Sequence, residues 1–157
     1  MRDPNYRPVD GGGADLRPPG AEEPPDITRD TKGFTAAIRT RLFAFLRAWL
    51  IADDEAALSG IDVPADAAGA AWTADRLRGA RDAYRVEHGQ LRLDPEARNL
   101  RHTYVQASDD RTRWRVQQML IDPNELNDWV LEVDVDLAAS REVGGPVIQV
   151  LRLGSLM

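Results

Sequence analysis

The most regular alternation of hydrophobic and polar positions lies between Trp114 and Leu137. Two alternating stretches, 114–121 and 129–137, flank a polar turn at 122–128. In the second stretch, apolar residues fill every other position, and three of the positions between them hold carboxylates. A period of two is typical of a strand with one face buried and one face in water. The segment is therefore predicted to form an antiparallel β-hairpin.

The hairpin also has a predicted register, because the apolar residues of its two strands must share one face. The expected pairs are Trp114–Val135, Val116–Val133, Gln118–Leu131 and Leu120–Trp129. Arg115 then lies opposite Asp134 on the outer face. Arg113 lies opposite Asp136, and each such pair contributes about 0.2–1 kcal/mol. A shift by two residues would pair Arg115 with Asp136 instead. The carboxylates of the hairpin all point outward in this arrangement, which argues against acid–base chemistry by a buried carboxylate.

Gln118 is the exception on the inner face, where the other positions of the two strands are apolar. A buried amide without partners costs about 1–3 kcal/mol. The side chain therefore either satisfies a backbone group inside the core or lines a cavity. Internal pairing is the favoured alternative, since buried polar groups are usually paired within the protein.

A long helix is predicted before the hairpin, capped by Asp30 or Thr28 and ending near Leu50. Its apolar residues recur at steps of three and four and form one stripe. The stripe consists of Phe34, Ile38, Leu42, Phe45, Leu46, Trp49 and Leu50. The other side carries Arg39, Thr40 and Arg47, with Arg41 at the boundary. A solvated face explains these arginines better than a phosphate site does.

Two further helices should follow. Asp53 and Asp54 place acids at the positive end of a short helix. A loop at 60–71 leads to a third helix, which Thr73 caps and Gly89 ends.

His88 belongs to the apolar line of this third helix, one turn after Tyr84. That position favours a core or helix-end histidine over a proton carrier or ligand. No carboxylate or second histidine has a spacing that would build a metal site on this helix.

Short strands are expected at 90–93 and 102–107, and a closing strand at 147–153, with a loop at 138–145. The closing strand is apolar on most positions of both faces, so it should lie centrally or be covered by a helix. Together the elements predict an α+β fold, with three N-terminal helices packed on one face of a curved antiparallel sheet of four to five strands.

This single α+β domain should span residues 28–157. Residues 1–27 hold six of the ten prolines and a run of glycines, and are predicted to form a disordered tail.

Composition excludes several function classes. The net charge of −6 counts against a freely acting nucleic-acid binder, and the absence of cysteine excludes disulfides and cysteine-ligated metals. No apolar run is long enough for a membrane span or a signal peptide, which fits a cytoplasmic protein. There is no phosphate-binding Gly-x-x-x-x-Gly-Lys-Ser/Thr loop, no Gly-x-Ser-x-Gly elbow and no His-Glu-x-x-His motif. We therefore expect no ATPase or helicase activity and no bound cofactor or metal.

Several motifs resemble those of a known family. They are Trp72-Thr-x-x-Arg76, Glu87-His88, Leu93-Asp-Pro-Glu-Ala-Arg98, Trp114-Arg-Val-Gln-Gln118, Asp122-Pro123, Asn127-Asp128-Trp129 and the run from Val133 to Ser140. From about residue 30 onward, the chain resembles the C-terminal part of a domain of unknown function that follows the motor of actinobacterial DEAD/DEAH-box helicases. None of the motifs is a catalytic signature. The resemblance implies a non-catalytic accessory domain whose partner is a helicase motor or another protein, with at most weak nucleic-acid contact.

The order of three helices and a curved sheet also resembles the cone-shaped fold of nuclear-transport-factor-like and cystatin-like domains. The alternative function is accordingly a stand-alone small-molecule binder or a lyase/isomerase-like enzyme. Its pocket would be lined by Trp72, Tyr84, His88, Tyr104, Trp114 and Gln118. The same residues could equally form a filled core. An open polar cavity with Gln118 and a histidine would favour the pocket protein, and a packed interior with an exposed basic or apolar patch would favour the accessory domain.

Overall fold

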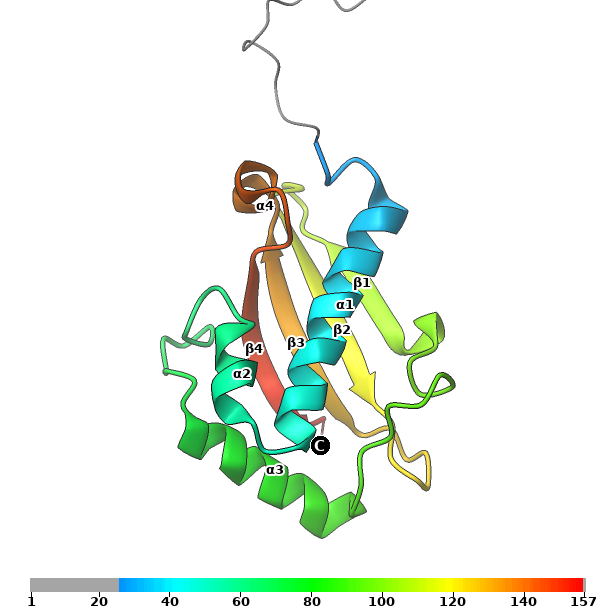
Figure 1. Ribbon diagram of the computed structural model, residues 1–157. Helices are drawn as coiled ribbons and strands as arrows, with labels where there is room; N and C mark the ends of the chain where they lie inside the picture. The colour runs from blue at the N-terminus through cyan, green and yellow to red at the C-terminus, as the bar shows by residue number, and fades with distance from the viewer. Residues whose placement is uncertain (1–25, 157) are drawn as a thin grey trace, which may run out of the picture.

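A four-stranded antiparallel sheet with the strand order β1-β2-β3-β4 carries the long N-terminal helix across one of its faces (Figure 1). The structure is a computed structural model that describes residues 26–156. Its elements are α1 (Thr31–Leu50), α2 (Asp54–Ser59), α3 (Ala74–His88), the 3₁₀ helix η1 (Leu100–His102), β1 (Thr103–Ala107), β2 (Arg113–Leu120), β3 (Trp129–Asp136), α4 (Leu137–Val143) and β4 (Ile148–Ser155). The predicted α+β class, with N-terminal helices packed on an antiparallel sheet, is confirmed.

Helix α1 crosses the sheet diagonally, and α2 and α3 follow beside β4 and at the lower end of the sheet in the view of Figure 1. Asp30 caps α1, because its carboxylate accepts the backbone N–H of Gly33 at 3.0 Å. The predicted stripe is buried from Phe34 to Trp49, whereas Leu50 is only half-buried. The Phe34 and Trp114 rings pack edge to face with their centroids 5.2 Å apart, which joins the start of the helix to β2.

The predicted caps of the two shorter helices are also confirmed. Asp53 accepts the backbone N–H of Ala56, and Thr73 accepts that of Arg76. Helix α3 ends at Gly89, whose φ of 76° is left-handed backbone that a glycine adopts without strain.

The hairpin has the predicted register at every pair, from Arg113 opposite Asp136 to Leu120 opposite Trp129. Val135 is buried in the core, and Asp134 is on the other face. Arg113 forms the predicted ion pair with Asp136 opposite it, at 3.4 Å, and also contacts Asp134 diagonally. Arg115 pairs diagonally with Glu132 at 3.3 Å instead of with Asp134. These arginines cover the carboxylates, so Asp134 is only 8% exposed and the outer face is less wet than predicted.

The predicted loop at 138–145 is wrong over most of its length, because Leu137–Val143 forms α4. Asp136 ends β3 and caps this helix by accepting the backbone N–H of Ala139 at 3.0 Å. Gly144, at φ 77°, ends it. Leu137, expected as the last residue of the strand, is the first of the helix and stays buried.

Strand β4 is an outer strand, and the segment 62–65 covers the beginning of its edge. Asp62 donates its N–H to the Ile148 carbonyl at 3.0 Å and accepts the Ile148 N–H at 2.8 Å. Gln149 donates to the Ala65 carbonyl, and the Trp72 indole donates to the Val150 carbonyl at 2.7 Å. The strand expected at 90–93 is reduced to a single bridge between Arg92 and Ile121.

The predicted tail at 1–27 lies outside the described residues except for its last two. Of these, Ile27 packs against the hydrophobic core. Across residues 26–156, none of the helices combines the length and the apolar character that crossing a membrane would require.

Candidate functional site

The six residues predicted to line a pocket are spread over different parts of the fold. Tyr84 and His88 lie together, with ring centroids 5.2 Å apart. Trp72 is buried against β4. Trp114 packs on Phe34, in the first turn of α1. Tyr104 pairs with Gln117, on the face turned away from the helices, and is 55% exposed.

Gln118 is fully buried and bonded within the core. Its side-chain oxygen accepts the Thr103 hydroxyl, and its amide nitrogen donates to the Met119 carbonyl at 3.2 Å. Arg39 in turn donates to the Thr103 hydroxyl at 3.1 Å. The predicted internal pairing is confirmed, and the residue serves packing.

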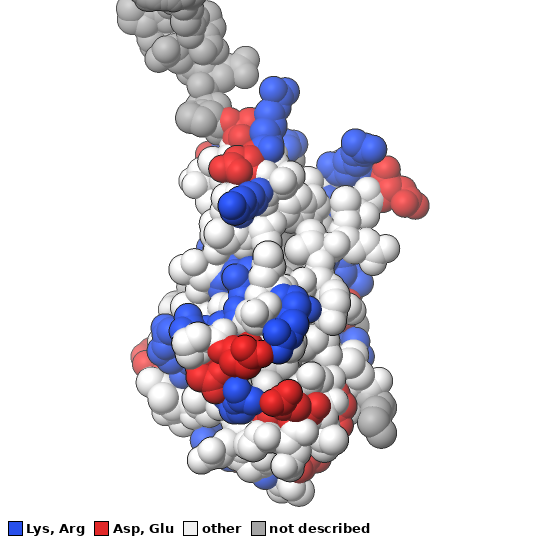
Figure 2. Space-filling view, turned by 90° about the vertical axis from the view of Figure 1, so that its right-hand side faces the viewer, with Lys and Arg blue, Asp and Glu red and all other residues white. Residues whose placement is uncertain are grey.

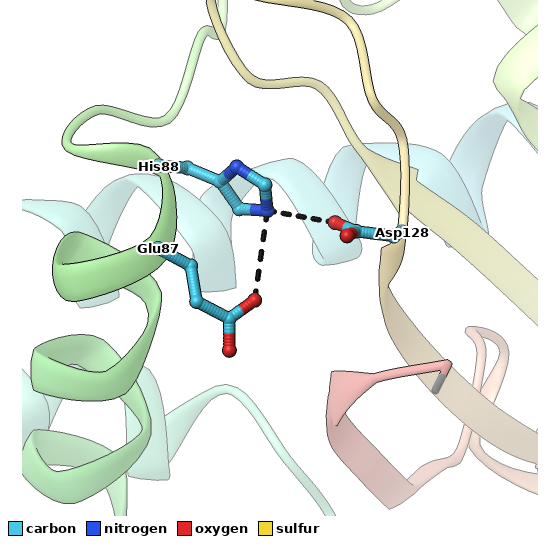
Figure 3. A group of neighbouring side chains, drawn as sticks. All are labelled: Glu87, His88 and Asp128. Atoms are coloured by element: carbon cyan, nitrogen blue, oxygen red, sulfur yellow. Dashed lines mark hydrogen bonds and ion pairs between the residues drawn. The ribbon is translucent and has the colours of Figure 1, made fainter.

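A second group of polar residues, buried in part, surrounds His88 at the C-terminal end of α3 (Figure 3). The His88 side chain is only 3% exposed. Its Nε2 lies 2.7 Å from Asp128 Oδ1 and 3.8 Å from Glu87 Oε1. On the opposite side of the ring, Nδ1 is 3.7 Å from Asp122 Oδ2 and has no hydrogen-bond partner. We refer to Glu87, His88, Asp122 and Asp128 as the His88 cluster.

Asp122 corrects the prediction that all hairpin carboxylates point outward, because it is 1% exposed. Its carboxylate accepts the backbone N–H groups of Asn127 at 3.0 Å and Asn124 at 3.1 Å. Burial acts to raise the pKa of Asp122, but backbone donors of the turn, Asn127 foremost, and the nearby His88 outweigh it and hold the pKa below its usual value. The cluster therefore contains a fixed buried negative charge.

The elements around the cluster hold its side chains in place. Gly89 stops α3 one residue after His88. Trp129, the first residue of β3, donates its indole N–H to Glu87 Oε1 at 2.9 Å. The backbone carbonyl of Asp128 accepts the N–H of Leu156 at 2.7 Å, which ties the start of β3 to the end of β4.

Tyr84 completes the surroundings. Its hydroxyl is buried and has no hydrogen-bond partner. Burial raises the pKa of Tyr84, and the negative charges of Asp122 and Asp128 raise it further. The hydroxyl therefore remains protonated at neutral pH. A histidine among carboxylates can carry a proton or hold a cation.

A shallow groove runs along the exposed side of α1, beside the segment 98–100. One half encloses about 370 Å³ and the other about 340 Å³, and the two share Ala36 and Arg39. The groove is lined by four cationic residues, Lys32, Arg39, Arg47 and Arg98, and by apolar residues that include Phe43 and Leu100. Figure 2 faces the side of the molecule that carries β1, and lysine and arginine side chains gather across the middle of it, above a group of acidic ones.

The groove differs from the solvated arginine face that the sequence predicts. Arg39 donates to Thr103 and to the Arg98 carbonyl, so it is held against the protein. Burial lowers the pKa of Arg39, and the positive charge of Arg98 lowers it further. Within residues 26–156, the four cationic residues of the groove form no ion pair with a carboxylate.

A family model for a domain of unknown function (DUF3516) matches residues 8–153. The chain belongs to this family. A search of the curated proteins and a search of the solved structures each find no significant match. The likeness to nuclear-transport-factor-like domains therefore stays a prediction. The family match confirms a domain of unknown function, while its association with a helicase motor stays a prediction as well.

Sequence patterns did not predict the His88 cluster of this DUF3516 domain, because its members come from separate elements. Two follow one another at the end of α3, and the others come from the turn between β2 and β3. No spacing along the helix could reveal that combination. One local signal existed: an aspartate two residues before an asparagine accepts the N–H of that asparagine and turns the chain, which draws Asp122 inward.

Proposed function

We propose that this DUF3516 domain is a non-catalytic interaction domain that acts beside a DEAD/DEAH-box helicase motor. It contacts an acidic segment of that motor through the groove along α1. The observation that carries the proposal is the set of cationic residues in the groove that lack carboxylate partners, next to exposed apolar surface at Leu100. The resemblance of the sequence to helicase C-terminal regions supports the choice of partner.

The charge of the groove is local. The whole chain carries −6, yet Lys32, Arg39, Arg47 and Arg98 meet at one place on it. Burial, and after it the positive charge of Arg98, lowers the pKa of Arg39 and so disfavours its charge. A partner that carries carboxylates relieves this repulsion, and it can also cover the apolar side chains beside it. A long negatively charged polymer would meet the acidic remainder of the surface, which favours a protein segment over nucleic acid.

The interior supports a packed domain rather than a pocket protein. Gln118 is buried and bonded. The buried indoles of Trp49 and Trp72 donate to backbone carbonyls at 2.9 and 2.7 Å. These polar groups have partners within the core, so they are not free to orient a small ligand there. The proposal for a lyase/isomerase-like enzyme accordingly has less support.

The proposal is tested by titrating the purified full chain with the motor region of a DEAD/DEAH-box helicase whose C-terminal part belongs to the same family. We expect binding in the micromolar range by calorimetry, weakened at least fivefold between 50 and 300 mM salt, estimates typical of charge-steered contacts. Arg47→Glu should weaken the binding about tenfold or more. Arg47 is exposed, so its replacement leaves the core intact.

Arg78→Glu is the matched control, because Arg78 is an exposed arginine on α3 that does not line the groove. It should bind like the wild type. The proposal is wrong if the motor does not bind, if Arg47→Glu binds as well as Arg78→Glu, or if single-stranded RNA or DNA binds more tightly than the motor. The chain alone should hydrolyse no ATP above a no-protein control.

A further inference from the structure

We propose that Glu87, His88 and Asp128 bind one divalent transition-metal ion of the zinc class. The site lies at the C-terminal end of α3, and none of its residues lines the groove along α1. It would add a metal-dependent element to an interaction domain, and it stands whether or not the domain binds a helicase motor.

The first argument is the geometry of the three ligand atoms. His88 Nε2, Asp128 Oδ1 and one Glu87 oxygen lie within 4.8 Å of one another. Zinc bonds of about 2.0–2.2 Å in a tetrahedron separate neighbouring ligand atoms by roughly 3.4 Å. The distances from Nε2, 2.7 Å to Asp128 and 3.8 Å to Glu87, lie on either side of that value. Small side-chain rotations therefore convert the arrangement into three ligands of one ion, with a fourth position left for water.

The second argument is the position of Asp122 behind the ring. Nδ1 of His88 is buried, has no hydrogen-bond partner and lies 3.7 Å from Asp122 Oδ2. A metal bound to Nε2 leaves the imidazole proton on Nδ1. The Nδ1–H can then donate a hydrogen bond to this buried carboxylate. Histidine ligands are commonly supported in this way by a carboxylate that fixes the tautomer and strengthens the ligand. The metal-bound state thus gives a partner to an atom that otherwise has none.

The third argument is charge. Three carboxylates, Glu87, Asp122 and Asp128, surround one imidazole. No lysine or arginine among the described residues forms an ion pair with any of the three carboxylates. A single positive charge on His88 would therefore face three carboxylates. The cluster also lies at the negative end of the α3 dipole, which favours a cation further.

Tyr84 provides an independent observation. Its buried hydroxyl has no hydrogen-bond partner, and its ring packs against the His88 ring. The hydroxyl can donate to a carboxylate that turns toward a metal or to a water bound on it. The site is open to an entering ion, because the Glu87 side chain is 45% exposed.

The ligand set indicates the class of metal. One imidazole nitrogen with two carboxylate oxygens suits zinc and neighbouring first-row ions. Magnesium and calcium prefer oxygen ligands alone. We therefore expect selectivity for zinc over both.

The test uses the full chain without an affinity tag, freed of metal with a chelator. Calorimetry with ZnCl₂ should show one ion per chain with a dissociation constant in the micromolar range or below, and at least tenfold weaker binding of Mg²⁺ and Ca²⁺. His88→Gln and Asp128→Asn should each weaken zinc binding at least tenfold. Nitrogen NMR of the wild type should show zinc on Nε2 of His88 with the proton on Nδ1.

His102→Gln is the matched control, because His88 and His102 are the only two histidines of the chain. Its zinc affinity should equal that of the wild type. The proposal is overturned if the wild type binds no stoichiometric zinc, if zinc coordinates Nδ1, or if both ligand variants bind within twofold of the wild type. Should His88→Gln fail to fold by circular dichroism, Asp128→Asn and the wild-type NMR spectrum decide the question.

Discussion

Two buried polar regions of this domain, Gln118 and the His88 cluster, differ in how completely their polar atoms are satisfied. Around Gln118, the amide, the Thr103 hydroxyl and the Arg39 guanidinium form a closed chain of hydrogen bonds. In the His88 cluster, the imidazole Nδ1 and the neighbouring Tyr84 hydroxyl have no partner, and carboxylates outnumber the imidazole. Closed networks specify packing, whereas unpaired buried atoms are unusual in native proteins and point to a further role. The contrast is the reason for proposing a metal site at the His88 cluster, separate from the groove along α1.

The largest effect should come from removing the closed network. Gln118→Ala should lower the free energy of unfolding by about 2–4 kcal/mol, because it leaves a void and removes the acceptor of the Thr103 hydroxyl. Urea unfolding followed by circular dichroism measures this. Gln118→Leu keeps the volume and should lose only about 1 kcal/mol. A loss below about 0.5 kcal/mol for Gln118→Ala would show that the network does not contribute to stability.

An intermediate effect is expected at Asp122. Asp122→Ala leaves the N–H groups of Asn124 and Asn127 without an acceptor, so it should lower the free energy of unfolding by about 1–3 kcal/mol at pH 7. The folded-state pKa of Asp122 is depressed, because its backbone donors and His88 outweigh burial. The stability that the ionised Asp122 contributes is therefore present above the pKa of the unfolded state, about 3.9. It is lost as the pH falls through the pKa of the folded state.

The pH dependence gives this prediction its check. The difference in stability between the wild type and Asp122→Ala should narrow as the pH is lowered from 6 to 3 in urea titrations. A difference that stays constant over this range would mean that the Asp122 charge is not stabilised in the folded protein.

The smallest effect should be at Tyr84. Tyr84→Phe keeps the ring packing against Trp129 and removes a hydroxyl that has no partner, so stability should stay within about 0.5 kcal/mol or rise by up to about 1 kcal/mol. A loss of more than 1 kcal/mol would reveal a hydrogen bond at this hydroxyl and weaken the contrast with Gln118.

Tyr84 also has an alkaline signature. Burial and the nearby carboxylates raise the pKa of Tyr84. The stability that its protonated hydroxyl contributes is therefore complete below the pKa of the unfolded state, about 10, and is lost as the pH rises above that pKa. Tyr84→Phe should therefore unfold less readily than the wild type at pH 11. Guanidinium titrations at pH 8 and pH 11 compare the two.

Local periodicity predicted the parts of the fold that rest on one buried face. The alternation from Trp129 to Val135 determined the hairpin register, since a one-residue shift would bury Asp134 in place of Val135. It did not predict where β3 ends. Asp136 fits both an outward strand position and a helix cap. In the structure it caps α4, because its carboxylate accepts the backbone N–H of Ala139.

The candidate site was only partly predictable. Tyr84 and His88 were identified as neighbours on one helix, and they do lie together. Their carboxylate partners come from the turn before β3, about 40 residues later, and only tertiary packing unites them. The buried position of Asp122 depends on backbone N–H groups that donate hydrogen bonds to its carboxylate inside the protein, which hydrophobic patterning does not encode.

The asymmetry of the two outer strands has a consequence for association. The segment 62–65 and Trp72 occupy the hydrogen-bonding groups at the beginning of β4, whereas β1 is largely exposed along its five residues. A strand from another chain would therefore find the first residues of β4 closed to it and the five residues of β1 open. Two copies joined at β1 would hide that edge of each and form a closed dimer.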